Sequence, residues 1–331
     1  MKQILKYAAV MIIAVLVLLG AVGCNEELPE SLTEYDYKTP RPLAGEDTNT
    51  HKTEAEKMQS YSGNVVGEGR SNDIFKYSIC ENGIQIDGLI DGCTLTSIDI
   101  PSEIEDKAVL GIATEAFCDN LTVENVTIPS SVKYIGTSAF RRNRKLATVT
   151  LNEGLLFVGE RVFDSCEVLS KLVFPQSVSY IGEYVCARSG VENISIPALI
   201  TRVPSGMYYG TAVKDFEIPS QVTHFYESAF AKCKNLTDIT IPGKVEYIGQ
   251  TAFANCINLK RVYIEEGCIE LCYGVFEGDP ALEDIYIPKT VVTFSSSLIP
   301  DANQDVIFHI KEGSKIEELV INKKHNYIAE K

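Results

Sequence analysis

The stretch that decides the fold is IPGKVEYIGQTAFANCINLKRVYI, residues 241–264. Its pattern, I-P-x-x-V-x-x-I-G-x-x-A-F-x-x-C-x-x-L-x-x-I-x, recurs at intervals of 22 or 23 residues along most of the chain. A unit of this length cannot bury its own apolar side, but stacked units bury their apolar residues in one continuous column. The sequence therefore predicts a repeat solenoid of about nine coils. The phenylalanine position falls on Phe117, Phe140, Phe163, Cys186, Tyr208, Phe230, Phe253, Phe276 and Ile299.

Each unit also contains the spacing L-x-x-L-x-L, as in Leu259, Val262 and Ile264. This spacing is the strand signature of leucine-rich repeats, and it predicts one short strand per coil in a single parallel sheet. Proline follows most of these strands and should end their pairing, because it lacks a backbone N–H. The glycine of the I-G pair is expected to permit a tight corner, at Gly136, Gly159, Gly182 and Gly249.

Small, mostly polar residues occupy the third position after the phenylalanine. We expect these side chains to satisfy buried backbone groups of neighbouring coils. The column consists of Asn120, Asn143, Cys166, Ser189, Thr211, Cys233, Cys256, Asp279 and Ala302.

The fourth and fifth coils depart from the pattern. Cys186 and Tyr208 replace phenylalanine, Pro204 and Tyr226 replace the glycine, and the repeat shortens to 22 residues. A local change in curvature is predicted there.

Different sequence patterns flank the repeats and predict end caps. Residues 59–94 include FKYSICENGIQIDGL, in which alternating apolar and polar residues surround Asn82-Gly83, and this indicates a β-hairpin cap. The solenoid is expected over residues 95–310. Residues 311–331 form a predicted polar cap that favours a helix from about Ser314.

The first 23 residues carry Lys2 and Lys6, an apolar run and then small residues before Cys24, which is the order of a secretory signal. The run is shorter than the roughly 20 apolar residues of a transmembrane helix. Ala21-Val22-Gly23-Cys24 resembles the lipobox of bacterial lipoproteins, although leucine is commoner where Ala21 stands. The resemblance implies that Cys24 is the lipidated N-terminus; an uncleaved anchor or a plainly secreted protein is the alternative.

Residues 24–58 are rich in charges and prolines and read as a flexible stalk or linker. The whole chain has a formal net charge of −15. Nucleic acid is therefore excluded as a partner. The membrane is expected to be contacted only through the N-terminal lipid.

From about Phe75 to the C-terminus, the repeated I-P, I-G and A-F markers resemble the BspA-like leucine-rich repeat surface proteins of bacteria. The resemblance implies a β-rich solenoid of leucine-rich repeats with a parallel β-sheet and a location on the cell surface or elsewhere outside the cytoplasm. Some relatives are adhesins that bind host proteins or other microbes.

No catalytic residue, cofactor or metal site is predicted. The four histidines form no Ser-His-Asp or Cys-His arrangement, and no phosphate-binding, dinucleotide-binding or zinc-protease motif occurs. Cys268 occupies the core valine position of the repeat and Cys272 the corner glycine, so packing is favoured over metal binding. A disulfide between Cys80 and Cys93 would suit an exported cap, and their redox state is left open. Cys233 and Cys256 lie close enough for a disulfide, but their parallel side chains disfavour one.

Strand side chains alternate faces, so the x positions of L-x-x-L-x-L point out of the core. Towards the C-terminus these outward columns become aromatic and charged, and tyrosine and arginine dominate binding energy at interfaces. The predicted binding face consists of Arg261, Tyr263, Asp284, Tyr286 and His309. The alternative is that tyrosine simply suits exposed strands. A second aromatic stripe ranks behind the first, with the alternative that its stacked rings only hold neighbouring coils together. It consists of Tyr134, Phe157, Tyr180, His224 and Tyr247.

These features together favour a surface-anchored lipoprotein that presents its solenoid to an extracellular protein or glycan, with adhesion as one outcome. A structural or scaffold protein of the cell envelope is the alternative. An enzyme is not expected, because the outward columns offer only scattered titratable groups.

Overall fold

The computed structural model describes residues 53–67, 69–193, 195–214, 216–298 and 305–331, with the backbone alone for residues 70–71. They belong to one compact unit. The predicted signal, Cys24 and the linker up to residue 52 therefore lie outside them. None of the helices in the described residues has the length and hydropathy needed to span a membrane.

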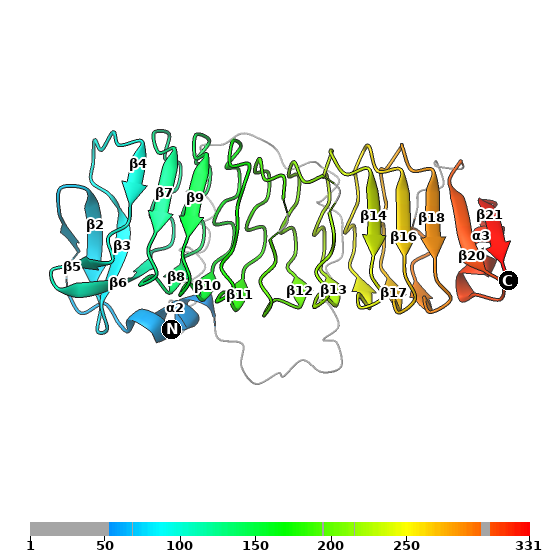
Figure 1. The fold of residues 1–331 in the computed structure, drawn as a ribbon, viewed down its shortest axis with the longest axis horizontal. Coiled ribbons are helices and arrows are strands. Elements are labelled where there is room, and N and C mark those ends of the chain that lie inside the picture. The colour runs from blue at the N-terminus through cyan, green and yellow to red at the C-terminus, as the bar shows by residue number, and fades with distance from the viewer. Residues whose placement is uncertain (1–52, 68, 194, 215, 299–304) are drawn as a thin grey trace, which may run out of the picture. The chain divides into compact units, whose positions relative to one another are not determined.

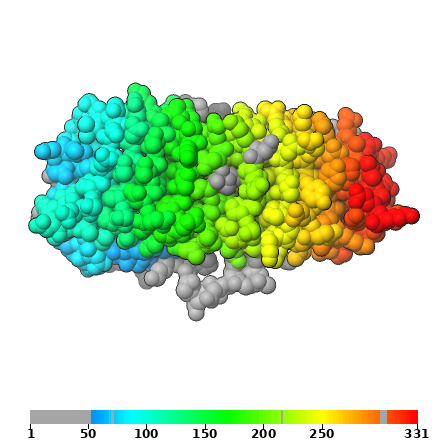
Figure 2. All heavy atoms as spheres, in the orientation of Figure 1, coloured from blue at the N-terminus to red at the C-terminus, as the bar shows by residue number. Residues whose placement is uncertain are grey.

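Successive coils stack through parallel strands at the L-x-x-L-x-L positions, as predicted (Figure 1). The regular repeats end these strands at the residue before proline, as at Ile128, Ile241 and Ile287. The coils form about ten turns, and their side chains touch without a gap in the space-filling view (Figure 2). The strands of this line are β4 (Ser97–Asp99), β7 (Asn125–Ile128), β9 (Thr148–Leu151), β14 (Asp238–Ile241), β16 (Arg261–Ile264), β18 (Asp284–Ile287), β20 (Ile307–Lys311) and β21 (Asn326–Glu330).

A second line of two-residue strands runs along the V-x-x-I-G positions, and the sequence analysis did not predict it. These strands also pair in parallel, for example Phe157 with Tyr180 and His224 with Tyr247. They are β8 (Tyr134–Ile135), β10 (Phe157–Val158), β11 (Tyr180–Ile181), β12 (Arg202–Val203), β13 (His224–Phe225), β15 (Tyr247–Ile248), β17 (Glu270–Leu271) and β19 (Thr293–Phe294).

The prediction of one continuous parallel sheet is wrong, because both lines are interrupted at the irregular coils. The first line divides into β4-β7-β9 and β14-β16-β18-β20-β21, and the second divides between β11 and β12. Figure 1 shows the wide arrows on either side of a stretch of bare loops. The interruption falls where the repeat shortens to 22 residues.

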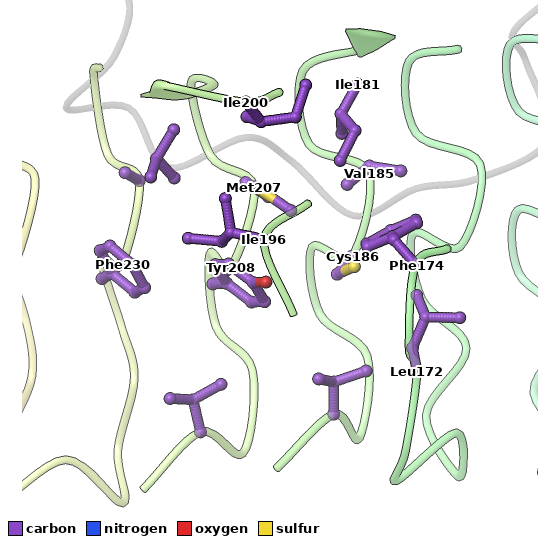
Figure 3. Close-up of a cluster of buried hydrophobic side chains, with 14 of the residues drawn as sticks. Leu172, Phe174, Ile181, Val185, Cys186, Ile196, Ile200, Met207, Tyr208 and Phe230 are labelled. Atoms are coloured by element: carbon purple, nitrogen blue, oxygen red, sulfur yellow. The ribbon is translucent and has the colours of Figure 1, made fainter. Parts of the chain in front are cut away.

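Tyr208 gives a physical reason for the interruption. Its buried hydroxyl accepts a hydrogen bond from the Ser195 N–H at 3.1 Å and donates one to the Ser195 C=O at 3.1 Å. The tyrosine therefore takes the backbone groups that a regular strand would use in its ladder, which phenylalanine cannot do. Figure 3 shows its oxygen inside the core, beside Cys186 and Phe230 of the neighbouring coils.

The phenylalanine column forms the centre of the core. Phe140 stacks on Phe163 with ring centroids 5.7 Å apart, and Phe230 stacks on Phe253 at 5.3 Å. All of these side chains are fully buried. Apolar burial and ring stacking between coils thus stabilise the stack.

Part of the polar column confirms the prediction, whereas Ser189 and Thr211 bond carbonyls of their own coil. Asn143 Nδ2 donates to the carbonyls of Phe117 and Phe140 at 2.8 and 2.7 Å. The Cys256 thiol donates to the Phe230 carbonyl, and the Cys256 N–H donates to Asp279 Oδ1 at 2.7 Å. Burial raises the pKa of Asp279 to about 8, because the site disfavours a carboxylate charge.

The tight corners do not come from the glycine of the I-G pair. Positive φ angles instead occur two residues before and two residues after the phenylalanine position, as at Ser138 and Arg142 around Phe140. Gly159 has a different role: a Cβ there would lie 2.7 Å from the backbone nitrogen of Thr137 in the preceding coil. The glycine therefore permits close approach between coils.

A buried carboxylate links coils on the N-terminal side of the interruption. Asp164 has a fully buried side chain, and Arg188 donates to both of its oxygens at 3.1 and 2.8 Å. Arg141 and Arg161 each lie 3.5 Å from Asp164 Oδ2. This group joins three successive coils through ion pairs, and Arg188 adds charge-assisted hydrogen bonds.

The N-terminal hairpin is present. Strands β2 (Phe75–Ile79) and β3 (Ile84–Leu89) pair antiparallel on either side of Asn82-Gly83, and β1 (Arg70–Ser71) pairs with β2. The hairpin joins the second line of strands because β3 pairs in parallel with β6 (Lys107–Ile112). Strand β5 (Glu103–Ile104) pairs with β6.

Helix α2 (Glu54–Ser62) was not predicted, and its first five residues fall in the expected linker. A capping box between Thr53 and Glu56 stabilises its first turn. The helix also has tertiary contacts, since the Glu160 N–H donates to Glu54 and the Lys57 ammonium lies 3.8 Å from the centre of the Tyr180 ring.

At the C-terminus, helix α3 (Lys315–Asn322) begins where the sequence predicts, with Ile316 and Val320 buried. Strand β21, which follows it, was not predicted. It pairs in parallel with β20 along five residues and all of its side chains are exposed.

Candidate binding surface

The predicted binding face lies on β16, β18 and β20, and the parallel register sets its two rows. Thr240 pairs with Tyr263, Tyr263 with Tyr286, and Tyr286 with His309. In the neighbouring row, Arg261 lies between Asp238 and Asp284. We call Arg261, Tyr263, Asp284, Tyr286 and His309 the tyrosine face.

The aromatic rings of the tyrosine face stack along the solenoid. Tyr286 and His309 have ring centroids 3.9 Å apart and an interplanar angle of 13°, and Tyr263 lies 5.3 Å from Tyr286 at 45°. Tyr263, at the N-terminal end of this stack, is 49% exposed. The faces of Tyr286 and His309 therefore cover each other, while the side of Tyr263 turned away from Tyr286 has no ring against it in the described residues.

An ion pair and a hydrogen bond fix the polar members of the tyrosine face. Arg261 forms a short hydrogen-bonded ion pair with Asp238, and this contact lowers the pKa of Asp238. His309 Nε2 is hydrogen bonded to Asp284 Oδ1 at 2.7 Å. The His309 side chain is only 13% exposed, so it supports Tyr286 and Asp284 and offers little surface of its own.

A groove of about 880 Å³ lies beside the tyrosine face, where the first line of strands resumes after its interruption. Residues 216–218 of the irregular coil form one wall, and residues of β14 and β16, with Pro242 and Tyr286 of β18, form the rest. No backbone hydrogen bond joins residues 216–218 to β14 in the described residues. The groove is lined by Phe216, Glu217, Ile218, Asp238, Ile239, Thr240, Pro242, Arg261, Tyr263 and Tyr286.

The groove is also lined by residues outside the binding face that the sequence predicts, chiefly Phe216, Glu217 and Thr240. The sequence feature that could have indicated these residues is the shortened repeat in which Tyr208 replaces phenylalanine, because the groove begins directly after it. Phe216 is half-buried and stacks on Phe230 at 5.1 Å, which ties this wall to the core.

The second aromatic stripe is not one open surface. Tyr134 and Phe157 are buried, and Tyr61 of α2 stacks on Tyr134 with ring centroids 6.2 Å apart. Phe157 and Tyr180 stack on each other at 4.6 Å. In the N-terminal half of the stripe, these rings therefore hold neighbouring coils and helix α2 together. In its C-terminal half, His224 and Tyr247 are half-buried.

The cysteines show core packing. Cys268 is buried, and burial raises its pKa to about 12; Cys272 is half-buried, and burial raises its pKa to about 11. Cys80 and Cys93 are free thiols, as are Cys233 and Cys256. Within the described ranges, no three His, Cys, Asp or Glu side chains gather as metal ligands.

Comparison with known proteins identifies the repeats. The family model described as the BspA type leucine rich repeat region (6 copies) matches residues 87–212 and 201–330. The chain belongs to the BspA-type leucine-rich repeat family. The matched ranges of this BspA-type chain include the irregular coils and the tyrosine face. No curated protein matches the chain.

Solved structures of leucine-rich repeat proteins are similar to this BspA-type chain. One from T. pallidum is 25% identical, with 69% of this chain and 86% of that chain covered and a TM-score of 0.37. A leucine rich cell surface protein from Faecalibacterium prausnitzii is 17% identical, with 80% and 95% covered and a TM-score of 0.42. The pneumococcal vaccine antigen PcpA is 15% identical, with 80% and 99% covered and a TM-score of 0.42.

Proposed function

We propose that this BspA-type protein is held at the bacterial surface by a lipid on Cys24 and binds an extracellular protein or glycan through its tyrosine face. The observation that carries the binding role is the exposed end of the aromatic stack, Tyr263, beside a groove lined by both apolar and charged residues. Tyrosine and arginine are the residue types that most often dominate binding energy. The acidic surface, with a formal charge of −15, disfavours nucleic acid as the ligand.

The anchor is supported by the signal-like residues 1–23 and by the small residues before Cys24. We expect cells fed a radioactive fatty acid to label the wild-type protein and to leave Cys24→Ala unlabelled. The variant should leave the membrane fraction, because the acyl chains supply its membrane affinity. Equal labelling of the wild type and Cys24→Ala would contradict the anchor.

The binding role is tested by presenting the full chain to arrays of extracellular matrix proteins, envelope proteins and glycans. Tyr263→Ala combined with Tyr286→Ala should weaken the ligand found on the array by at least about 30-fold, the effect of losing about 2 kcal/mol at an interface. The matched control is Tyr226→Ala with Tyr247→Ala, which removes two half-buried tyrosines, one directly after β13 and one in β15. Binding that survives the first pair and is lost with the second would place the interface elsewhere.

A further inference from the structure

The tyrosine face ends at the groove, beside Thr240. We call the part of the groove over Thr240, between Glu217 and Tyr263, the notch. Thr240 is small and exposed, and it is the row's neighbour to Tyr263 on β16. One repeat of 23 residues before Thr240, the same row holds Glu217. Glu217 and Tyr263 therefore lie one repeat before and one repeat after Thr240, and all three residues line the groove.

The two walls of the notch have complementary chemistry. Tyr263 supplies a ring that is 49% exposed, and its only ring neighbour in the described residues is Tyr286 on the far side. Glu217 is exposed and takes part in no ion pair within the part of the chain that the structure describes. Asp238 and Asp284, by contrast, are already paired with Arg261 and His309.

The lower part of the notch is apolar. Ile218 and Ile239 are buried beneath it, and Phe216 and Pro242 line the groove around it. A long side chain with a charged end fits this combination, because its methylenes cover the apolar part while the charged end meets the ring and the carboxylate. An ammonium or guanidinium group is attracted to the face of tyrosine within about 6 Å of its centre.

We propose that the notch above Thr240 receives an arginine or lysine side chain from a protein partner. Arginine fits better, since its planar guanidinium can stack on Tyr263 while it donates two hydrogen bonds to Glu217. This inference rests on the proposed binding function and narrows its ligand from a protein or glycan to a basic segment of a protein.

The ring geometry disfavours a sugar as the main ligand. Stacked sugars need exposed ring faces, but Tyr286 and His309 cover each other at 3.9 Å, and only Tyr263 offers a face. An acidic ligand would meet the unpaired charge of Glu217 and the net charge of −15. Arg261, a cation that lines the same groove, is paired with Asp238.

The probe for the test is a capped Gly-Gly-Arg-Gly-Gly peptide, titrated into the full chain and followed by saturation-transfer NMR. The arginine methylenes should receive most of the saturation. Glu217→Gln and Tyr263→Leu should each raise the Kd at least about fivefold, the loss of roughly 1 kcal/mol from one ion pair or ring contact. Thr240→Arg should abolish binding, because the protein's own arginine then fills the notch.

Thr150→Arg is the matched control. Thr150 is exposed on β9 at the same position of its repeat as Thr240, and its replacement by arginine adds the same charge. The control should bind the arginine peptide like the wild type. Capped Gly-Gly-Glu-Gly-Gly and a neutral linear glucan are the other two probes, and neither should bind. The proposal is overturned if the arginine peptide fails to bind, if Glu217→Gln leaves its Kd unchanged, or if the acidic peptide or the glucan binds better.

The two proposals fail differently. An array ligand whose binding depends on Tyr263 and Tyr286 but is unchanged in Glu217→Gln and Thr240→Arg would keep the proposed function and remove the notch. Arrays without any ligand would count against the proposed function, while the peptide titration would still decide the notch.

Discussion

Asp279→Asn should make the protein markedly more stable than the wild type at pH 9, and this difference should be much smaller at pH 5. Asp279 is buried in the polar column, and burial raises its pKa from 3.8 to about 8. The folded state therefore holds a proton that the unfolded state releases between about pH 4 and pH 8. The wild type should lose stability over that range, by up to about 5 kcal/mol at about 1.36 kcal/mol per pKa unit.

Asparagine removes the titration and keeps the acceptor for the Cys256 N–H, and Asn143 already occupies the same column. Urea unfolding of both proteins at pH 5 and pH 9 measures the difference. Asp99→Asn, at an exposed strand position, is the control and should change little at either pH. A pH dependence in Asp279→Asn equal to that of the wild type would show that Asp279 is not its source.

Phe230→Ala should lower the free energy of unfolding by about 3 to 5 kcal/mol, the usual cost of truncating a fully buried phenylalanine. Phe230 is fully buried and stacks on Tyr208 and Phe253, each with ring centroids 5.3 Å away. It also supports Phe216, a wall of the groove. Its loss should therefore weaken both the stack of coils and binding at the tyrosine face.

Phe230→Leu keeps most of the volume and should cost about 1 kcal/mol. Leu121→Ala removes an exposed leucine and should fall within about 0.5 kcal/mol of the wild type. The measurement is urea unfolding followed by circular dichroism. A loss for Phe230→Ala no larger than for Phe230→Leu would contradict a continuous, tightly packed column.

Repeat phase predicted most of the fold because neighbouring coils repeat the same contacts. The phase placed Thr240, Tyr263 and Tyr286 in one row, and the strand register confirms that order. It also placed Asn143 and Asp279 in a buried polar column. The environment of such positions depends only on the neighbouring coil, so the repeat pattern of the sequence predicts it.

The features that the sequence did not reveal depend on individual contacts between side chains. At Ser195, within the interruption, the Tyr208 hydroxyl bonds both backbone groups of one residue. Helix α2 has a readable capping box at Thr53, but its packing partner Tyr180 lies far along the chain. The alternation of strand side chains predicted that His309 points away from the core. Its ring stacks on Tyr286, however, and its side chain is only 13% exposed.

Hydrogen–deuterium exchange of the full chain, with and without the ligand found on the array, tests most directly that the tyrosine face is the binding surface. Binding should slow exchange at residues 216–218 and in β14, β16 and β18, and leave β7, β9 and α2 unchanged. Protection confined to β7, β9 or α2 would contradict the account.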